Sequence, residues 1–278
     1  MTRNDYHADT ARVSKSGLDQ IAKSPLHYWD RYLNPDHPER KAAKHFRVGD
    51  VTNDILLIPD DFRNLYAVLP IGAPNRPTDR QINAFRPSKE TVAAVEWWNN
   101  YLAENEGKTV VTPEEFDTAR FVRDAVLKHR PAAELLKVGI AEKTIYFDEP
   151  TTGAKCKCRP DWLATDARFV VDLKTSKDAA PRAFGRSAAA YRYHVQGAFY
   201  YDGVAYGLGE WYDGFAFIAA EKERPFPVKV YYMDDDDFNA GRRLYMADLE
   251  KYVECLSTGQ WPGYGDQIER LQLPNYSL

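Results

Sequence analysis

The sequence predicts an α/β domain with a mixed central sheet and helices on both of its faces. The first half reads as a series of helices, and residues 140–175 read as three strands separated by turns. A helix, two further strands and a long closing helix follow. Helices that come before and after an antiparallel hairpin system favour one layered α/β domain over two separate ones.

The helices of the first half have clear start and stop signals. Pro25 divides the first segment into two helices, because proline fits only the first turn of a helix, and Pro59 ends another. Thr112 is a predicted N-cap, followed by proline in the first turn and by Glu115 three residues on. Residues 70–87, rich in Pro, Asn and Arg, predict a long exposed loop. The predicted helices cover residues 16–33, 46–58, 88–106 and 112–129.

The second half carries the predicted sheet. Runs of β-branched and aromatic residues bounded by turn residues indicate strands. The acidic run 234–237 lies at a predicted helix start, where carboxylates cap free amides, so we interpret it as a cap rather than a metal site. Strands are predicted at 140–147, 155–163, 168–175, 214–220 and 227–233, and helices at 191–206 and 234–256. The chain then divides into a mainly helical part (1–135), a sheet core (136–260) and a C-terminal tail (261–278).

Composition excludes several classes of protein. Hydrophobic residues make up 44% and charged residues 28%, a balance typical of globular proteins and unlike disordered chains or fibres. No apolar run is long enough to cross a membrane, and the first residues lack the apolar stretch of a signal peptide, so we expect a cytoplasmic protein without a membrane partner. Three cysteines cannot form a four-thiolate metal site, and we expect reduced, packed thiols.

The charge of the chain is unevenly distributed. The net charge is −4, which is not typical of a nucleic-acid-binding protein. Residues 153–192, however, contain nine Lys or Arg and four Asp, so this window has a net charge of +5 while the remainder has −9. Such a basic strip could bind a polyanion. The alternative is an ordinary solvated face, and charge alone does not separate the two.

Two aspartates and a lysine form the most informative pattern. Asp172 and Lys174 share one face of a predicted strand, because side chains alternate along a strand. A hairpin turn centred between residues 166 and 167 places Asp161 opposite Asp172, with Cβ atoms roughly 4.5–5.5 Å apart. Like charges at that distance repel, and a divalent cation removes the conflict. Two carboxylates, a metal and a lysine suit phosphodiester hydrolysis, whereas the alternative is a surface hairpin with a cross-strand salt bridge.

These residues resemble a known signature. Pro160-Asp161 followed by Asp172-Leu173-Lys174 resembles the motif of the PD-(D/E)xK nuclease superfamily. Other segments resemble one branch, the RecE-type (exonuclease VIII-like) phage recombination exonucleases, over roughly residues 13–260. The segments that carry this likeness are Val13-Ser14-Lys15-Ser16-Gly17-Leu18, Ser24-Pro25, Lys157-Cys158-Arg159-Pro160-Asp161, Tyr193-His194-Val195-Gln196 and Ala198-Phe199-Tyr200. The resemblance implies a restriction-endonuclease-like fold and a single nuclease domain over residues 1–278.

The resemblance also implies roles for individual residues. Asp161 and Asp172 would be metal ligands and Lys174 the catalytic lysine. Gln196 and Tyr200 resemble a Gln-x-x-x-Tyr motif of related nucleases, and their i, i+4 spacing places both on one helix face. The alternative for this pair is packing of an amphipathic helix.

Two further positions are candidate metal ligands. Glu142, expected on the first strand, resembles a glutamate often present there that assists the metal or binds DNA, although a lone glutamate at a strand start is more often structural. Asn53 stands four residues after Gly49, where the family has a metal-contacting histidine. An asparagine carbonyl oxygen binds hard cations more weakly than a charged or imidazole ligand. This departure would weaken one metal site.

The function implied by the resemblance is a Mg²⁺-dependent exonuclease, with Mn²⁺ as a substitute, that degrades linear duplex DNA from 5′ to 3′ and leaves single-stranded tails for recombination. A ring-shaped homo-oligomer around the DNA and a partner single-strand annealing protein are implied as well. We expect Lys177, Arg182 and Arg186, in the basic window, to contact DNA phosphates. The alternatives are a PD-(D/E)xK nuclease of another specificity, Cas4-like or endonucleolytic, and a catalytically weak protein that binds DNA ends.

Overall fold

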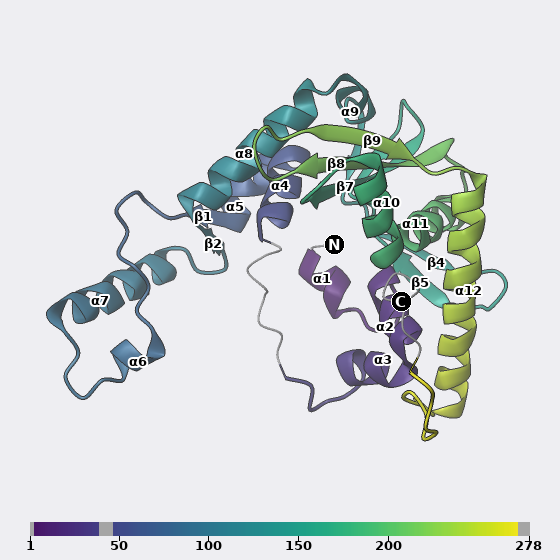
Figure 1. Ribbon diagram of the computed structural model, residues 1–278, viewed down its shortest axis with the longest axis horizontal. Helices are drawn as coiled ribbons and strands as arrows, with labels where there is room; N and C mark the ends of the chain where they lie inside the picture. The colour runs from purple at the N-terminus through teal and green to yellow at the C-terminus, as the bar shows by residue number, and fades with distance from the viewer. Residues whose placement is uncertain (1–2, 39–46, 272–278) are drawn as a thin grey trace.

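A five-stranded mixed sheet forms the centre of the computed structural model, which describes residues 3–38 and 47–271 (Figure 1). The strand order is β3-β6-β7-β8-β9. β7 and β8 pair in parallel and the other neighbours are antiparallel, so the predicted mixed sheet is confirmed. The strands are β3 (Gly139–Ala141), β6 (Trp162–Ala164), β7 (Phe169–Ser176), β8 (Gly214–Glu221) and β9 (Val228–Tyr232).

Helices cover both faces of this sheet, as predicted. One face packs against α11 (Tyr193–Leu208), which in turn packs against α12 (Asp235–Thr258). Helices α2, α3 and α10 complete that side, and α4, α8 and α9 cover the other face. Their bounds are Lys15–Lys23 (α2), Pro25–Tyr32 (α3), Arg47–Leu57 (α4), Pro113–Lys128 (α8), Arg130–Leu135 (α9) and Pro181–Ala190 (α10), and a short α1 (Arg3–Ala8) precedes them.

Alternation along β7 divides its side chains between the two faces. Val171 and Leu173 are buried in the core beneath α8 and α9. Val170 belongs to the core on the α11 side, and Asp172 points to this same side. A buried aspartate among apolar neighbours therefore faces α11, and its position fixes where the site must form.

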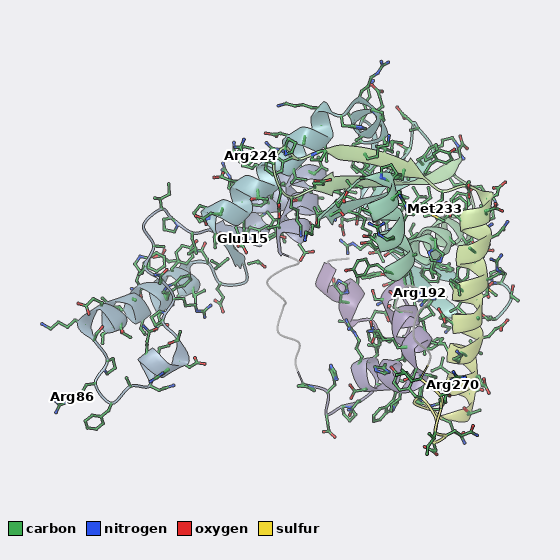
Figure 2. All side chains as sticks on the ribbon, in the orientation of Figure 1. Arg86, Glu115, Arg192, Arg224, Met233 and Arg270 are labelled. Carbon is green, nitrogen blue, oxygen red and sulfur yellow. The ribbon has the colours of Figure 1, made fainter. Side chains whose placement is uncertain are left out.

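A second, smaller sheet supports an arm that extends from the body. β1 (Tyr66–Val68) and β2 (Thr109–Val111) pair in parallel and follow a 3-10 turn (Pro59–Asp61) and α5 (Phe62–Leu65). Between these strands the chain runs out through α6 (Asp79–Ile82) and α7 (Lys89–Glu104), with Arg86 at the far end (Figure 2). Residues 70–87 are mostly exposed loop, as predicted. The three-residue strands of this sheet were too short for their pattern to predict them.

Two of the predicted strands are wrong, because each is broken into two. The segment 140–147 divides into β3 and β4 (Ile145–Asp148), and 155–163 divides into β5 (Lys155–Cys158) and β6. β4 and β5 leave the central sheet and pair with each other. Pro160 lacks an amide hydrogen and Glu142 has a left-handed φ of 51°, so neither continues a regular ladder. Glu142 therefore follows the first strand rather than lying within it.

The predicted helix over 191–206 also needs correction. It begins at Tyr193, and a separate helix, α10, precedes it. Arg192 has a left-handed φ of 56° and forms the corner between the two helices. Its side chain binds Asp19 and Asp248, which holds this corner against α2 and α12.

Several smaller expectations are confirmed. Thr112 and Glu115 form a reciprocal capping box, and Asp234 caps α12 by accepting from the Asp237 amide. The three cysteines are free and buried. Across the described ranges, no helix has the length and apolar character needed to traverse a bilayer. Phe46, at the start of a predicted helix, and residues 272–278 of the predicted tail lie outside the described residues.

The crossing of α11 and α12 generates a prediction about stability. A Cβ at Gly241 would lie 2.3 Å from the His194 carbonyl oxygen and 2.8 Å from the Ala198 Cβ. Gly241→Ala should therefore destabilise the protein by about 1–3 kcal/mol through overpacking. Gly185→Ala, in helix α10 with open space around it, should be neutral or stabilising by up to about 1 kcal/mol. Urea unfolding of both variants measures the difference, and equal midpoints would contradict the close approach.

Candidate active site

The β6–β7 hairpin has the register that the sequence predicts. Trp162 pairs with Val171, so the next step along the ladder brings Asp161 to Asp172. The Asp161 Oδ2 atom accepts a hydrogen bond of 2.8 Å from the Leu173 amide. Asp161 thus directly precedes the first residue of β6, next to the strand break at Pro160, and its carboxylate is hydrogen-bonded to the backbone of β7.

Asp172 is held from two sides. Its side chain is almost completely buried. Gln196 Nε2, from α11, donates a hydrogen bond of 2.6 Å to Oδ1, and Lys174 Nζ lies 2.5 Å from Oδ2. The structure therefore brings Gln196 and Lys174 to the same carboxylate, from a helix and from the strand itself.

The two carboxylates perturb each other. Burial and the nearby charge of Asp172 raise the pKa of Asp161 well above its usual range, although Lys174 opposes this. Burial disfavours the charged form of Lys174, but the attraction of Asp172 and Asp161 outweighs it and raises the Lys174 pKa. Lys174 is therefore a fixed ammonium, and Asp161 resists the second negative charge that a fully deprotonated pair would carry.

The donor set fits a hard divalent cation. Asp172 Oδ2 is buried, and within the described residues its contact is the ion pair with Lys174, with no further donor directed at it. Such an oxygen, beside a second carboxylate with a raised pKa, is a suitable ligand for Mg²⁺. Residues 3–38 and 47–271 contain no group of three or more His, Cys, Asp or Glu that could hold a metal. Mg²⁺ commonly takes only one or two carboxylates and completes its shell with water and substrate oxygens.

The two other predicted ligands lie beside this pair. Asn53, on α4, donates to Asp161 Oδ2 at 3.3 Å, so the residue at the family's histidine position does reach the site. Glu142 accepts a hydrogen bond of 2.7 Å from Arg159 Nε, and both side chains are largely buried. Glu142, predicted as a metal ligand, thus forms an ion pair with Arg159 in the structure. The sequence did not predict this ion pair. Its charge still contributes to the raised pKa of Asp161.

Tyr200 is placed differently from Gln196. It lies one turn further along α11, on the side that faces the site, and is partly buried. Burial raises the pKa of its hydroxyl group well above its usual range, with smaller contributions from neighbours that include Asp172. In the described structure the hydroxyl forms no hydrogen bond with either aspartate. It remains protonated and next to the pair.

A cleft of about 1350 Å³ opens beside the carboxylate pair, and its lining reaches the pair through Lys174 and Asn53 rather than through the aspartates themselves. Lys174 and Asn53, each in contact with one of the aspartates, line it together with Lys177 and Arg186. Arg182 is exposed on α10 but does not line the cleft. Of the three predicted DNA contacts, two therefore share the cleft with Lys174 and one does not.

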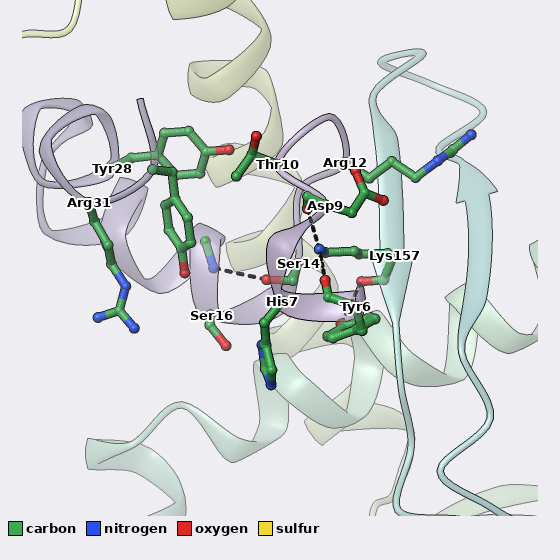
Figure 3. Close-up of a pocket in the computed structure, with 12 residues that line it drawn as sticks. Tyr6, His7, Asp9, Thr10, Arg12, Ser14, Ser16, Tyr28, Arg31 and Lys157 are labelled. Atoms are coloured by element: carbon green, nitrogen blue, oxygen red, sulfur yellow. Dashed lines mark hydrogen bonds between the residues drawn. The ribbon is translucent and has the colours of Figure 1, made fainter. Parts of the chain in front are cut away.

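Another cavity, of about 380 Å³, lies among the N-terminal helices and β5 (Figure 3). Its lining includes His7, Arg31, Tyr28 and Lys157. The Lys157 ammonium lies within it and donates hydrogen bonds to the carbonyl groups of Tyr6 and Asp9. Because Lys174 lines the larger cleft and does not line this cavity, we assign the chemistry to the larger cleft.

The sequence did not predict that two aromatic residues, Tyr191 and Tyr193, line the cleft. Lys174 Nζ lies 4.9 Å from the centre of the Tyr193 ring, and Tyr191 stacks beside Tyr193. Both tyrosines line the cleft. Tyr193 opens the Tyr-His-Val-Gln motif, but a motif match alone does not say that the ring contacts the lysine.

Comparison with known proteins agrees with this geometry. A family described as "PDDEXK-like domain of unknown function (DUF3799)" matches residues 14–274. The chain belongs to this PDDEXK-like family. Among solved structures, it is similar to a protein from Eubacterium rectale described as a "putative exonuclease", with a TM-score of 0.61, 13% sequence identity and coverage of 100% of this chain and 97% of the other. At that identity the likeness establishes the fold. The comparison with curated proteins gave no match.

The PDDEXK-like site generates a prediction about metal and pH. In chelator, the raised pKa of Asp161 contributes stability that is present below the ordinary value of 3.8 and is lost as the pH rises through the folded-state pKa. A metal needs the deprotonated pair, so stabilisation by Mg²⁺ should grow as the pH rises through that same pKa. Asp172→Asn should show a smaller increase in melting temperature with Mg²⁺ at every pH.

Thermal unfolding across a pH series, in chelator and in Mg²⁺, measures both effects. Asp166→Asn, in the exposed turn of the same hairpin, is the matched control and should respond as the wild type does. Equal responses to Mg²⁺ in wild type and Asp172→Asn would show that the pair does not bind metal.

Proposed function

We propose that this PDDEXK-like protein is a Mg²⁺-dependent deoxyribonuclease, a RecE-type exonuclease that degrades linear duplex DNA from 5′ to 3′. The observation that carries the proposal is the position of Lys174. Its ammonium lies 2.5 Å from Asp172, beside Asp161, and lines a cleft that also contains Lys177 and Arg186. Paired carboxylates, a lysine and a cleft that presents further cationic side chains together suit hydrolysis of a phosphodiester.

The roles of the residues follow from their contacts. Asp161 and Asp172 would hold the cation, which on binding supplies a Lewis acid and an acidified water. Gln196 fixes the orientation of the Asp172 carboxylate through Oδ1, and Asn53 and the Leu173 amide do the same for Asp161. Lys174 places a permanent positive charge where negative charge develops on the phosphate and can orient the attacking water. Mn²⁺ should substitute for Mg²⁺, since the same oxygens bind it.

The charge distribution supports a polyanionic substrate. Lys177 and Arg186 are exposed in the cleft, whereas the chain as a whole has a net charge of −4. The lining of the cleft contains four Lys or Arg and three carboxylates, Asp50, Asp178 and Glu221, so its cationic side chains, rather than a uniformly positive surface, would attract the phosphates of DNA. Contacts of this kind bind phosphates without regard to sequence, as an exonuclease requires.

The biological setting of the proposal comes from the family resemblance. It includes single-stranded tails made for recombination, a ring-shaped homo-oligomer around the DNA and a partner annealing protein. A second candidate function is a catalytically weak protein that binds DNA ends. The observation that favours it is Asn53, because its amide donates to Asp161 where the family's histidine would contact a metal.

The decisive prediction concerns cleavage. Asp161→Ala, Asp172→Ala and Lys174→Ala should each abolish Mg²⁺-dependent cleavage of linear duplex while the protein remains folded. Asp166→Ala, in the turn of the same hairpin, should cleave as the wild type does.

Linear duplex labelled at the 5′ or the 3′ end reports polarity, and nicked and closed circles report endonuclease activity. Wild-type digestion by folded Asp172→Ala protein would refute the site. Binding of linear duplex without digestion by the wild type would favour the end-binding function.

A further prediction concerns the DNA path. Lys177→Ala and Arg186→Ala should weaken binding similarly on unrelated duplex sequences, and each should flatten the log–log salt slope by about 0.9. Arg182→Ala should have a smaller effect, because Arg182 lies outside the cleft lining. Arg243→Ala, exposed on α12, is the control. Binding measured by fluorescence anisotropy over a salt series tests this, and an unchanged slope in the Lys177→Ala, Arg186→Ala double variant would place the path elsewhere.

A further inference from the structure

An aromatic row leads from the protein core into the cleft. Phe184 is buried, and its ring lies 5.9 Å from that of Tyr193. Tyr193 is half-buried and stacks on Tyr191, with ring centres 5.8 Å apart and an interplanar angle of 25°. Tyr191 ends the row with 65% of its surface exposed. A large aromatic side chain thus stands in the open cleft, with one ring face toward Tyr193 and most of its surface in solvent.

The backbone beneath Tyr191 is firmly held. Its amide donates to the Ser187 carbonyl at 2.8 Å, and its carbonyl accepts from Lys15 Nζ at 3.1 Å. Lys15 is itself buried and paired with Asp19 at 2.8 Å. Arg192, the next residue, binds the same Asp19 and Asp248. A group that stacks on Tyr191 therefore meets a surface that needs little further ordering, which favours binding.

The row also borders the reacting centre. The Tyr193 ring lies beneath Lys174 Nζ at 4.9 Å, and Lys174 contacts Asp172. Arg186, on the same cleft, offers a charge for a phosphate. The cleft lining also holds Asp50, Asp178 and Glu221, so its cations are individual side chains among carboxylates. Aromatic faces beside such cations are the combination that binds unpaired nucleotides, because every base presents a π-face and every nucleotide a phosphate.

We propose that Tyr191, backed by Tyr193, forms a subsite for a single unpaired nucleobase next to the phosphate held at the carboxylates. This inference deepens the proposed nuclease function and rests on it for the position of the phosphate. A base that stacks on Tyr191 cannot remain stacked in a duplex at that step. The strand in the cleft is therefore single-stranded at this nucleotide, and the subsite selects for an unstacked base without reading its identity.

Binding of single-stranded oligonucleotides in chelator, where no cleavage occurs, tests the subsite. Tyr191→Ala should weaken binding on the order of tenfold, as expected for loss of one base–aromatic stack, and Tyr191→Phe should retain it. A 2-aminopurine placed successively along the oligonucleotide should be quenched by wild type at one position only, and Tyr191→Ala should remove that quenching. Tyr232→Ala, 75% exposed on β9 and outside the cleft lining, is the control.

Abasic oligonucleotides separate stacking from general weakening. Removing the base at the quenched position should weaken binding to wild type but not to Tyr191→Ala, whereas abasic sites elsewhere should affect both proteins equally. Two outcomes would overturn the subsite: Tyr191→Ala could weaken binding equally for the intact oligonucleotide and for the one abasic at the quenched position, or Tyr191→Phe could have a defect equal to that of Tyr191→Ala. Unchanged binding by Tyr191→Ala, with normal cleavage, would overturn the subsite and leave the nuclease function intact. Position-specific quenching in a protein that cleaves no DNA would overturn the nuclease function alone.

Discussion

The repulsion between Asp161 and Asp172 is the constraint on which the rest of the site depends. Two carboxylates on one face of a hairpin, one of them almost fully buried, would destabilise most sheets. Here the contacts of both carboxylates come from a cation or from hydrogen-bond donors, which reduces the repulsion. Lys174 supplies one positive charge, the Leu173 amide and Asn53 donate to Asp161, and Gln196 donates to Asp172. One buried carboxylate oxygen still has no hydrogen bond within the described residues, which is the state that a divalent cation would relieve.

The fold brings these partners from three separate segments, one of which is β7 itself. Asn53 comes from α4 on one side of the sheet and Gln196 from α11 on the other. The break at Pro160 and Glu142 directs β4 and β5 out of the sheet, so the chain turns at the point where Asp161 emerges. Because Arg159 takes up the charge of Glu142, a third acidic group close to the pair is largely neutralised by a guanidinium. The Glu142 carboxylate therefore binds a guanidinium beside the pair, while its charge still contributes to the raised pKa of Asp161.

Charge and aromatic surface are concentrated in the same cleft. Lys174, Lys177 and Arg186 give it positive charge, while Tyr191 and Tyr193 give it flat apolar surface. These features depend on the corner at Arg192, whose side chain connects α2, α11 and α12. A partly buried ion network at this corner, outside the carboxylate pair itself, thus helps to determine where the Tyr191 and Tyr193 rings stand.

The sequence by itself determined the mixed sheet, the helices on both faces and the register that joins Asp161 to Asp172. The register was predictable because side chains alternate with a period of two and a short turn leaves little freedom in pairing. Lys174 followed from the same alternation. The family's motifs located Gln196 on the helix that follows, and this chain places it against Asp172.

Only the tertiary structure decided the remaining contacts of the site. Asn53 meets Asp161 across 108 positions of sequence, and the pairing of Arg159 with Glu142 depends on two strand breaks that face each other. The orientation of Tyr191 could not be predicted from local sequence either. It depends on the left-handed backbone of Arg192 and on the ion pairs of Arg192 with Asp19 and Asp248. Periodicity specifies which face of an element a side chain occupies. Which side chain lies opposite it depends on how the elements pack, and that is a property of the whole chain.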